Sequence, residues 1–170
     1  MAFETDAPMH PEPIVQLLLL LIVANGTPVL ARKLLGEVLD YPLDGGKTFL
    51  DGRPIFGSSK TIRGIATSVV ATSASASLLG LAFTTGLLIG AMSMGGDLVS
   101  SFLKRRLGYV SSSRALGLDQ IPEALFPAIV CKDLLGLSVV DVVQVVTLFT
   151  LGEILLSRLF FKLHIREQPY

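Results

Sequence analysis

The chain has 170 residues, of which 51% are hydrophobic and only 16% are charged, and its mean hydropathy is +0.64. Soluble domains carry about 25% charged residues, so this composition excludes an ordinary soluble domain and indicates a membrane protein. The formal net charge of zero argues against general binding of nucleic acid, and the single cysteine excludes disulfides and thiolate metal sites as organising features.

The apolar blocks predict five membrane-spanning helices, because a span needs roughly 20 mostly apolar residues. The first covers residues 14–35, includes Asn25-Gly26-Thr27-Pro28, and follows an acidic tail without Lys or Arg, which is unlike a secretory signal. The others cover residues 61–83, 87–103, 121–137 and 139–161, with a tight turn at 84–86. We expect an all-α, polytopic membrane protein: one integral-membrane domain over residues 1–170 with polar loops at 36–60 and 104–120.

The Lys and Arg residues gather in the two polar loops, their flanks and the C-terminal end. The acidic N-terminal tail, the 84–86 turn and the link near Ser138 lie on the other side of the predicted spans. Because basic loops remain cytoplasmic, we expect a multi-pass protein of the cell membrane. Its N-terminus would be outside, and its C-terminus and functional site cytoplasmic.

One face of the third predicted span is polar. An ionised carboxylate inside a span usually faces the interior of a bundle or a cavity. At helical spacing this face carries the side chains of Asp97, Ser100, Ser101 and Lys104. Arg105 follows directly in the sequence. This stripe predicts an inward-facing site, and the alternative is a structural Asp97–Lys104 pair.

A second carboxylate, Asp119, stands with Gln120 just before the fourth span. Alone, a carboxylate at a helix start is often an N-cap. Together with Asp97 on the same side of the membrane, it would supply a second oxygen ligand. Mg²⁺ binds one or two carboxylates plus substrate phosphates and water, so the pair predicts a magnesium site.

The segment 51–64 leads into the second span and suits an anion. A glycine-containing loop before a helix N-terminus presents free N–H groups to phosphates, and the cations add charge. The candidate substrate-binding residues are Gly57, Ser58, Ser59, Lys60, Thr61 and Arg63. The spacing is not that of a Walker A loop. The alternative is a capped helix flanked by cations that set the topology.

Histidine catalysis is not expected, because His10 and His164 lie far from these motifs in the sequence. No Ser-His-Asp or Cys-His arrangement can be assembled. A reaction that depends on positioning and electrostatics, with the nucleophile supplied by a substrate, fits the motifs better. Phosphoryl-type transfer is such a reaction.

Taken together, segments 51–64 and 96–105 and the Leu118-Asp119-Gln120 element resemble the CDP-archaeol synthase family, the ether-lipid relatives of phosphatidate cytidylyltransferases. The likeness covers nearly the whole chain, including residues 25–28 and 43–46. The resemblance implies an all-helical membrane enzyme with a cytoplasmic site and Mg²⁺ as cofactor. It would join CTP to an isoprenoid ether-linked glycerol phosphate, forming a CDP-lipid and pyrophosphate.

By position, the resemblance implies that Asp97 and Asp119 hold the metal, that Lys104 and Arg105 neutralise phosphates, and that Lys60 and Arg63 hold the triphosphate or the lipid phosphate. The related cytidylyltransferases carry His-Gly-Gly and then Asp-Arg-x-Asp. Here Asp119-Gln120-Ile121 is followed by Pro122 and Glu123. Glu123 is therefore the candidate replacement for the second acid, and the pattern retains a one-metal site.

Several alternatives remain open: an ester-lipid phosphatidate cytidylyltransferase, an anion transporter and a non-catalytic homologue. A CDP-alcohol phosphotransferase would need closely spaced aspartates that the chain lacks. The expected partners are CTP, a lipid phosphate and the bilayer, with no nucleic acid, and association into a homo-oligomer is left open. The small residues from Ala71 to Ser77 favour close helix packing.

Overall fold

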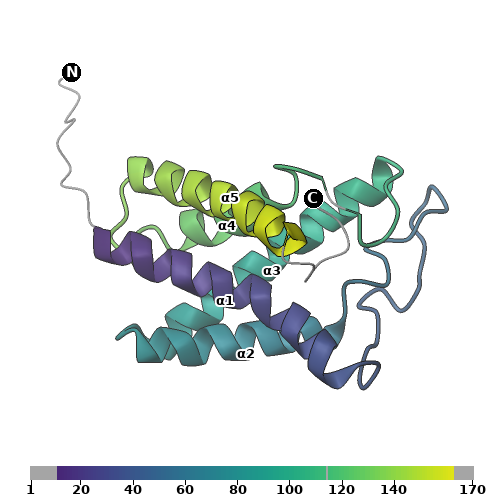
Figure 1. The fold of residues 1–170 in the computed structure, drawn as a ribbon, viewed down its shortest axis with the longest axis horizontal. Helices are drawn as coiled ribbons and strands as arrows, with labels where there is room; N and C mark the ends of the chain where they lie inside the picture. The colour runs from purple at the N-terminus through teal and green to yellow at the C-terminus, as the bar shows by residue number, and fades with distance from the viewer. Residues whose placement is uncertain (1–10, 114, 163–170) are drawn as a thin grey trace.

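The computed structural model describes residues 11–113 and 115–162, and side chains as far as Leu156. Its helices are α1 (Pro11–Leu35), α2 (Ile62–Leu78), α3 (Phe83–Arg106), α4 (Gln120–Val130) and α5 (Val139–Lys162) (Figure 1). Only two isolated bridges and no strand occur in these described ranges, so the all-α prediction is confirmed. The acidic N-terminal tail and the basic residues beyond 162, which contribute to the predicted orientation, lie outside the described residues.

Three helices are long and apolar enough to cross a membrane: Pro11–Leu35, Phe83–Arg106 and the Val139–Leu156 part of α5. Helix α2 has 17 residues and α4 has 11, so the count of five spans stays a prediction. Helix α4 ends at Val130 instead of residue 137, because turns follow from Cys131 to Gly136, which has a positive φ of 65°.

The predicted turn at residues 84–86 is wrong. The turn between α2 and α3 lies at Gly80, whose φ of +79° ends the helix. The N–H of Leu81 donates to the Ala76 carbonyl at 2.9 Å, which satisfies the end of α2. Helix α3 therefore begins at Phe83, and Gly86 lies inside it.

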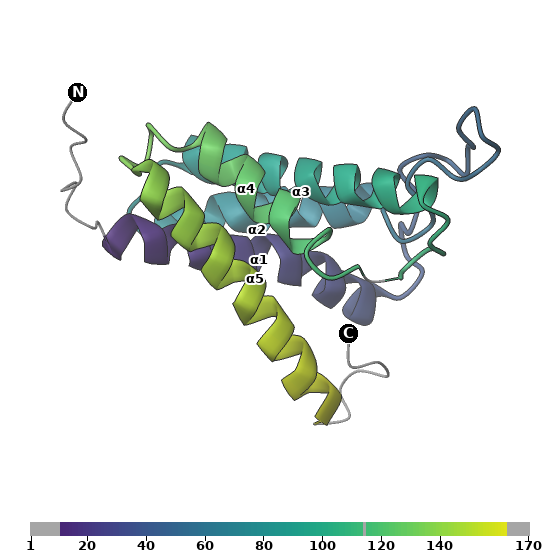
Figure 2. The ribbon, with the colours of Figure 1, turned by 90° about the horizontal axis from the view of Figure 1, so that it is seen from above.

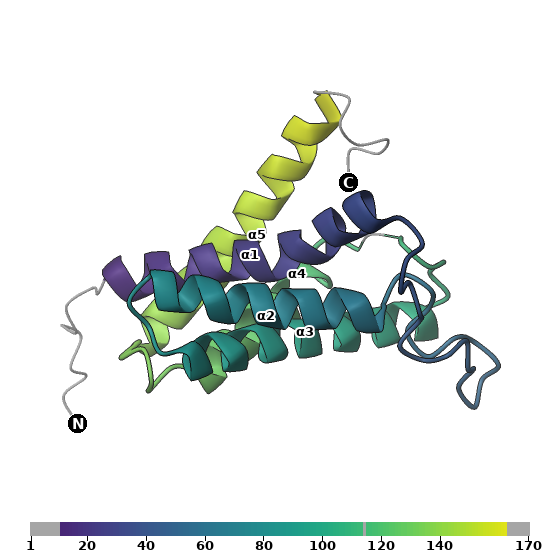
Figure 3. The ribbon, with the colours of Figure 1, turned by 90° about the horizontal axis from the view of Figure 1, so that it is seen from below.

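Helices α1, α2 and α3 lie side by side, and α4 and α5 complete the bundle (Figures 2 and 3). The loops that connect α1 to α2 and α3 to α4 gather at one end of the bundle. Helix α5 crosses the bundle and diverges from α1 toward its C-terminal end. Both predicted polar loops thus meet at one place.

Close contact between α2 and α3 depends on glycine. A Cβ built on Gly86 would lie 2.5 Å from the Ala76 Cβ and 2.7 Å from the Ser73 Cα. A Cβ on Gly90 would lie 3.1 Å from the Val69 Cα. The predicted packing role of the small residues of α2 is therefore confirmed.

Pro28 lies inside α1, where its ring removes one backbone hydrogen bond. The carbonyl that loses its helical donor is that of Ala24, four residues earlier. Ser68 of α2, which is fully buried, donates its hydroxyl to this carbonyl at 2.7 Å. Helix α1 consequently runs on to Leu35.

We expect Ser68→Ala to lower the free energy of unfolding by about 1–3 kcal/mol, because the buried Ala24 carbonyl loses its donor. Pro28→Ala returns a backbone N–H to the same carbonyl. In that background, Ser68→Ala should cost only about half as much. Unfolding of the wild type, both single variants and the double variant in detergent measures this difference. If Ser68→Ala lowered the free energy of unfolding equally in both backgrounds, the Ser68 hydroxyl could not be the group that replaces the lost donor to the Ala24 carbonyl.

Candidate active site

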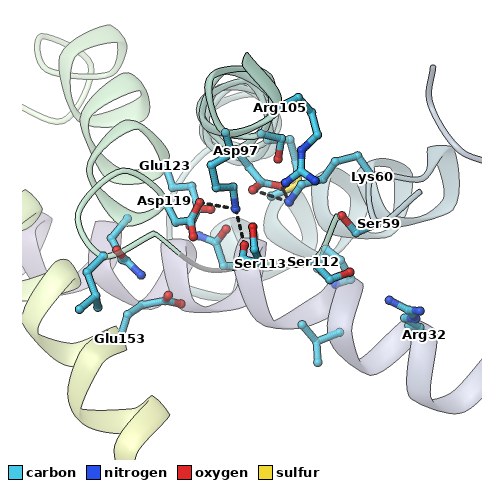
Figure 4. Close-up of a pocket in the computed structure, with 18 of the residues that line it drawn as sticks. Arg32, Ser59, Lys60, Asp97, Arg105, Ser112, Ser113, Asp119, Glu123 and Glu153 are labelled. Atoms are coloured by element: carbon cyan, nitrogen blue, oxygen red, sulfur yellow. Dashed lines mark hydrogen bonds and ion pairs between the residues drawn. The ribbon is translucent and has the colours of Figure 1, made fainter. Parts of the chain in front are cut away.

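A polar cavity of about 470 Å³ lies where α1, α3, α4 and α5 meet the two polar loops (Figure 4). It brings together residues that are far apart in the sequence. The predicted site residues that line it are Ser59, Lys60, Asp97, Ser101, Lys104, Arg105, Asp119, Gln120 and Glu123. All three sequence motifs therefore contribute to one site.

Lys60 and Asp97 form the first of two ion pairs in the cavity. The Lys60 ammonium lies 2.5 Å from both carboxylate oxygens of Asp97. The side chains are 21% and 17% exposed, respectively. The Lys60 carbonyl accepts the Leu43 N–H at 2.7 Å, which fixes the loop backbone beside α2. The pair joins the first polar loop to α3.

Asp44 organises the backbone that precedes Lys60. Its buried carboxylate accepts the N–H groups of Phe56 and Gly57, each at 2.9 Å. A third N–H, that of Gly46, donates at 3.0 Å. Burial alone would raise the pKa of this carboxyl, but the backbone N–H donors outweigh burial and hold the pKa below its ordinary value. The N–H of Gly57 is thereby engaged within the loop.

Asp44 should stabilise the fold in a pH-dependent way. Because its pKa is lower in the folded protein, the stabilisation is fully present above the ordinary pKa of 3.8 and is lost as the pH falls through the folded value. Asp44→Asn should lower the free energy of unfolding by about 1–3 kcal/mol at neutral pH, and the difference should shrink in acid. Unfolding curves across this pH range measure it. A difference that does not change with pH would contradict the account of Asp44.

Lys104 and Asp119 form the second ion pair, with the ammonium 2.6 Å from Oδ1. Lys104 also donates to the Ser113 carbonyl at 2.8 Å (Figure 4), and Asp119 Oδ2 accepts the Ala115 N–H at 2.9 Å. Asp119 stands at the N-cap position of α4 but makes no side-chain cap hydrogen bond. The two structural alternatives, a capping Asp119 and an Asp97–Lys104 pair, are therefore wrong.

Glu123 brings a third carboxyl beside Asp97. It is buried in the first turn of α4. Helices α3 and α4 approach closely at Gly96, where an added Cβ would lie 2.2 Å from the Pro122 carbonyl oxygen and 2.8 Å from the Glu123 nitrogen. Pro122 is therefore part of the helix contact that sets Glu123 against Asp97.

Two buried residues of α3 that line the cavity carry polar atoms without a hydrogen-bond partner among the described residues. Ser101 is 2% exposed and its Oγ is unsatisfied, and Arg105 is 4% exposed with an unsatisfied Nε. Buried polar groups in proteins nearly always have partners. The wall that α3 contributes to the cavity therefore contains buried polar atoms that lack a partner.

Five predicted site residues do not line the cavity: Gly57, Ser58, Thr61, Arg63 and Ser100. The Ser58 hydroxyl lies 3.4 Å from that of Ser111, and the Ser100 hydroxyl donates to the Asp97 backbone carbonyl at 2.9 Å. A Cβ on Gly57 would lie 2.7 Å from the Ser111 Oγ. These three residues therefore pack the walls around the site.

Thr61 and Arg63 build the junction between α1 and α2. Thr61 caps α2 by accepting the Gly64 N–H at 3.1 Å. Arg63 pairs with Asp40 at 2.8 Å and donates to the carbonyls that follow α1, including that of Gly36 at 3.0 Å. For these two residues the structure shows the capped helix start that the sequence left as the alternative.

Comparison with known proteins identifies the family of this chain. The model of the CarS-like family, described as CDP-archaeol synthase, matches residues 14–170. The chain belongs to this family.

The similarity extends to individual family members and to a solved structure. A CDP-archaeol synthase of Pyrobaculum calidifontis is 34% identical over 165 residues, which are 92% of this chain and 98% of the relative. One of Hyperthermus butylicus is 39% identical over 106 residues, 59% of this chain and 60% of the relative. A structure described as an intramembrane enzyme for archaeal membrane lipid biosynthesis has a TM-score of 0.70 at 31% identity, covering 82% of this chain and 89% of the other.

The CDP-archaeol synthase family suggests a divalent metal, and the carboxylates of the cavity fit one. No group of three or more His, Cys, Asp or Glu side chains within the described residues is arranged to hold a metal. Mg²⁺ needs only one or two carboxylates when substrate phosphates complete its shell. Asp97 and Asp119 supply such oxygens. Each of these carboxylates already pairs with a cationic group, Asp97 with Lys60 and Asp119 with Lys104, so both lie where positive charge is favoured.

The structure adds polar lining residues that the sequence did not predict: Asn25, Arg32, Ser112, Ser113 and Glu153. Asn25 and Glu153 carried a usable signal, because polar side chains in apolar helices usually face a bundle interior. The serines carried none, because their position depends on the path of the second loop. From the sequence, Arg32 was interpreted only as a basic residue that helps to set the membrane topology.

An apolar groove of about 440 Å³ adjoins the polar cavity between α1 and α5. Asn25, Val29 and Glu153 border both spaces. Leu18 and Ile22 of α1 and the side chains of α5 that face them form the groove's apolar walls. The candidate site of this chain therefore has a charged compartment and an apolar one that meet at α1 and α5.

Proposed function

We propose that this chain transfers the cytidylyl group of CTP to the phosphate of an isoprenoid ether-linked glycerol lipid, releasing pyrophosphate. Membership of the CDP-archaeol synthase family supports this reaction. The structural observation that carries it is the junction of a charged cavity with an apolar groove at Asn25, Val29 and Glu153. A reaction between a water-soluble nucleotide and a membrane lipid needs both environments at one site.

The lipid chains lie in the groove between α1 and α5, with the lipid phosphate at the cavity. Helix α5 diverges from α1 toward its C-terminal end (Figure 2), and the lipid chains enter the groove between these two helices from the bilayer. Contact with apolar walls such as Leu18 and Ile22 suits hydrocarbon chains. The nucleotide enters from the end of the bundle where the polar loops gather. This end faces the cytoplasm in our proposal, because loops rich in Lys and Arg usually remain on that side.

In the reaction, an oxygen of the lipid phosphate attacks the α-phosphorus of CTP. A new P–O bond forms as the bond between the α-phosphorus and the β-phosphate oxygen breaks, and pyrophosphate leaves with the electron pair. The protein contributes positioning and charge stabilisation, which dominate catalysis of this kind of transfer. No covalent intermediate with the protein is required.

Lys60 and Lys104 counter the charge on the phosphates, and Arg105, which lines the same cavity, adds positive charge. Asp97 and Asp119 would hold Mg²⁺ beside them, with Glu123 next to Asp97. When bound, Mg²⁺ would offset the negative charge that accumulates where two phosphate-bearing substrates meet. Each ion pair thus supplies one group for the metal and one for the phosphates.

Pyrophosphate release tests the proposed reaction. Purified protein would receive CTP and Mg²⁺ with an isoprenoid ether-linked glycerol phosphate, an ester-linked phosphatidate or no lipid. We expect release that requires lipid and Mg²⁺, is fastest with the ether lipid, and is abolished by Asp119→Asn. Faster release with phosphatidate would instead favour the ester-lipid alternative. No release with either lipid, or release unchanged by Asp119→Asn, would reject the proposal.

A further inference from the structure

Acidic and basic side chains face the same cavity. Among the described residues, four acidic and four basic ones line it: Asp97, Asp119, Glu123 and Glu153, and Arg32, Lys60, Lys104 and Arg105. A bare divalent cation would add two positive charges beside the basic residues, and bare CTP would add its negative charges beside the acidic residues. A complex of the two carries less negative charge than bare CTP and no net positive charge.

The candidate metal ligands already have cationic partners. Both oxygens of Asp97 lie 2.5 Å from the Lys60 ammonium. One oxygen of Asp119 lies 2.6 Å from the Lys104 ammonium, and the other accepts a backbone N–H. A divalent cation arriving alone must therefore approach each carboxylate against an adjacent like charge.

We propose that the two ion pairs exchange partners when substrate binds: the carboxylates take the metal and the lysines take the nucleotide phosphates. This inference rests on the proposed function, because it assumes a metal–nucleotide substrate. It makes Lys60 and Lys104 specificity-determining residues. They weaken binding of a free divalent cation and couple cation binding to nucleotide binding.

Lys60 is the better residue for a test. Lys104 is only 7% exposed and also donates to the Ser113 carbonyl, so its removal would disturb the second loop. Lys60 is 21% exposed, and the only described hydrogen bonds of its side chain are to Asp97. Removing the Lys60 ammonium should therefore expose the Asp97 carboxylate with little loss of structure.

Mn²⁺ binding without nucleotide or lipid provides the measurement, since Mn²⁺ takes carboxylate oxygens as Mg²⁺ does. Free Mn²⁺ would be followed by electron paramagnetic resonance in purified wild type, Lys60→Met and Lys47→Met. Lys47 is an exposed residue of the same loop, so its variant matches the change in charge and side chain. We expect Lys60→Met to bind Mn²⁺ about tenfold more tightly than wild type, and Lys47→Met to match wild type.

Coupling to nucleotide gives a second readout. A non-reactive α,β-methylene analogue of CTP should raise the Mn²⁺ affinity of the wild type by about tenfold and that of Lys60→Met by clearly less. The exchange would be overturned if Lys60→Met bound Mn²⁺ no more tightly than the wild type. It would also be overturned if the analogue left the Mn²⁺ affinity of the wild type unchanged. These measurements involve no turnover. Failure of the exchange in a protein that still forms CDP-lipid would therefore reject the exchange while the proposed function stands.

Discussion

Asp97→Asn should reduce the rate of cytidylyl transfer by about 10³-fold. The amide has nearly the shape of the carboxylate but lacks the negative charge that pairs with Lys60 at 2.5 Å and would bind the metal. The loss should persist at saturating substrate, because the metal that Asp97 would hold offsets charge on the phosphates during the reaction as well as during binding. Initial rates at saturating CTP and lipid measure it.

Asp133→Asn provides the matched control for this prediction. The Asp133 side chain is 98% exposed in the link between α4 and α5 and does not line the cavity. The control should transfer cytidylyl groups at the wild-type rate, and both variants should retain the wild-type Tm. If Asp97→Asn stayed within about tenfold of wild type, Asp97 could not have the role assigned to it.

Gly96→Ala should reduce both stability and activity. Its Cβ would lie 2.2 Å from the Pro122 carbonyl oxygen and 2.4 Å from the carbonyl carbon, and a helix backbone cannot yield as a flexible side chain can. Separation of α3 from α4 would destabilise the fold by about 1–3 kcal/mol. It would also displace Glu123 from Asp97, and a misplacement of about 1 Å can slow a reaction about 10²-fold.

Gly95→Ala separates this effect from the general consequence of adding a methyl group to α3. A Cβ on Gly95 has no atom within 4 Å, so this variant should keep the wild-type rate and gain slightly in helix propensity. Thermal unfolding and transfer rates of the two variants would be compared side by side. Similar behaviour of both variants would contradict the α3–α4 contact.

The helical fold follows from local properties of the chain, but its helix ends do not. Apolar blocks of sufficient length predicted all the helices. The turn was predicted at residues 84–86, although Gly80 with its positive φ forms it. Because small and apolar residues occur on both sides of this turn, composition alone did not locate it. The buried face of Gly86 becomes apparent only when α2 lies against it.

The site was predictable where its residues share one element. Asp97, Ser101 and Lys104 follow helical spacing and line the cavity together. Residues at loop positions were harder, because side-chain direction there depends on tertiary contacts. Arg63 belongs to the phosphate-binding segment in sequence, yet it ties α2 to the end of α1 through Asp40.

Pro122 illustrates a limit of reading motifs by position. In sequence, Pro122 occupies the position at which the Asp-Arg-x-Asp element of related cytidylyltransferases has its second aspartate. In the structure its carbonyl lies against Gly96, and the next residue, Glu123, reaches the cavity beside Asp97. The third carboxyl therefore comes from the next residue in the first turn of α4, a placement that only the packing of the two helices reveals.

The fate of the individual phosphorus atoms of CTP tests most directly whether this site joins a nucleotide to a lipid. The protein would be placed in liposomes that contain the ether-linked lipid phosphate and supplied with CTP labelled at either the α- or the γ-phosphorus. Label from the α position should move into the lipid phase, and label from the γ position should remain in water as pyrophosphate. Transfer of the γ label to lipid, or retention of both labels in water, would contradict cytidylyl transfer.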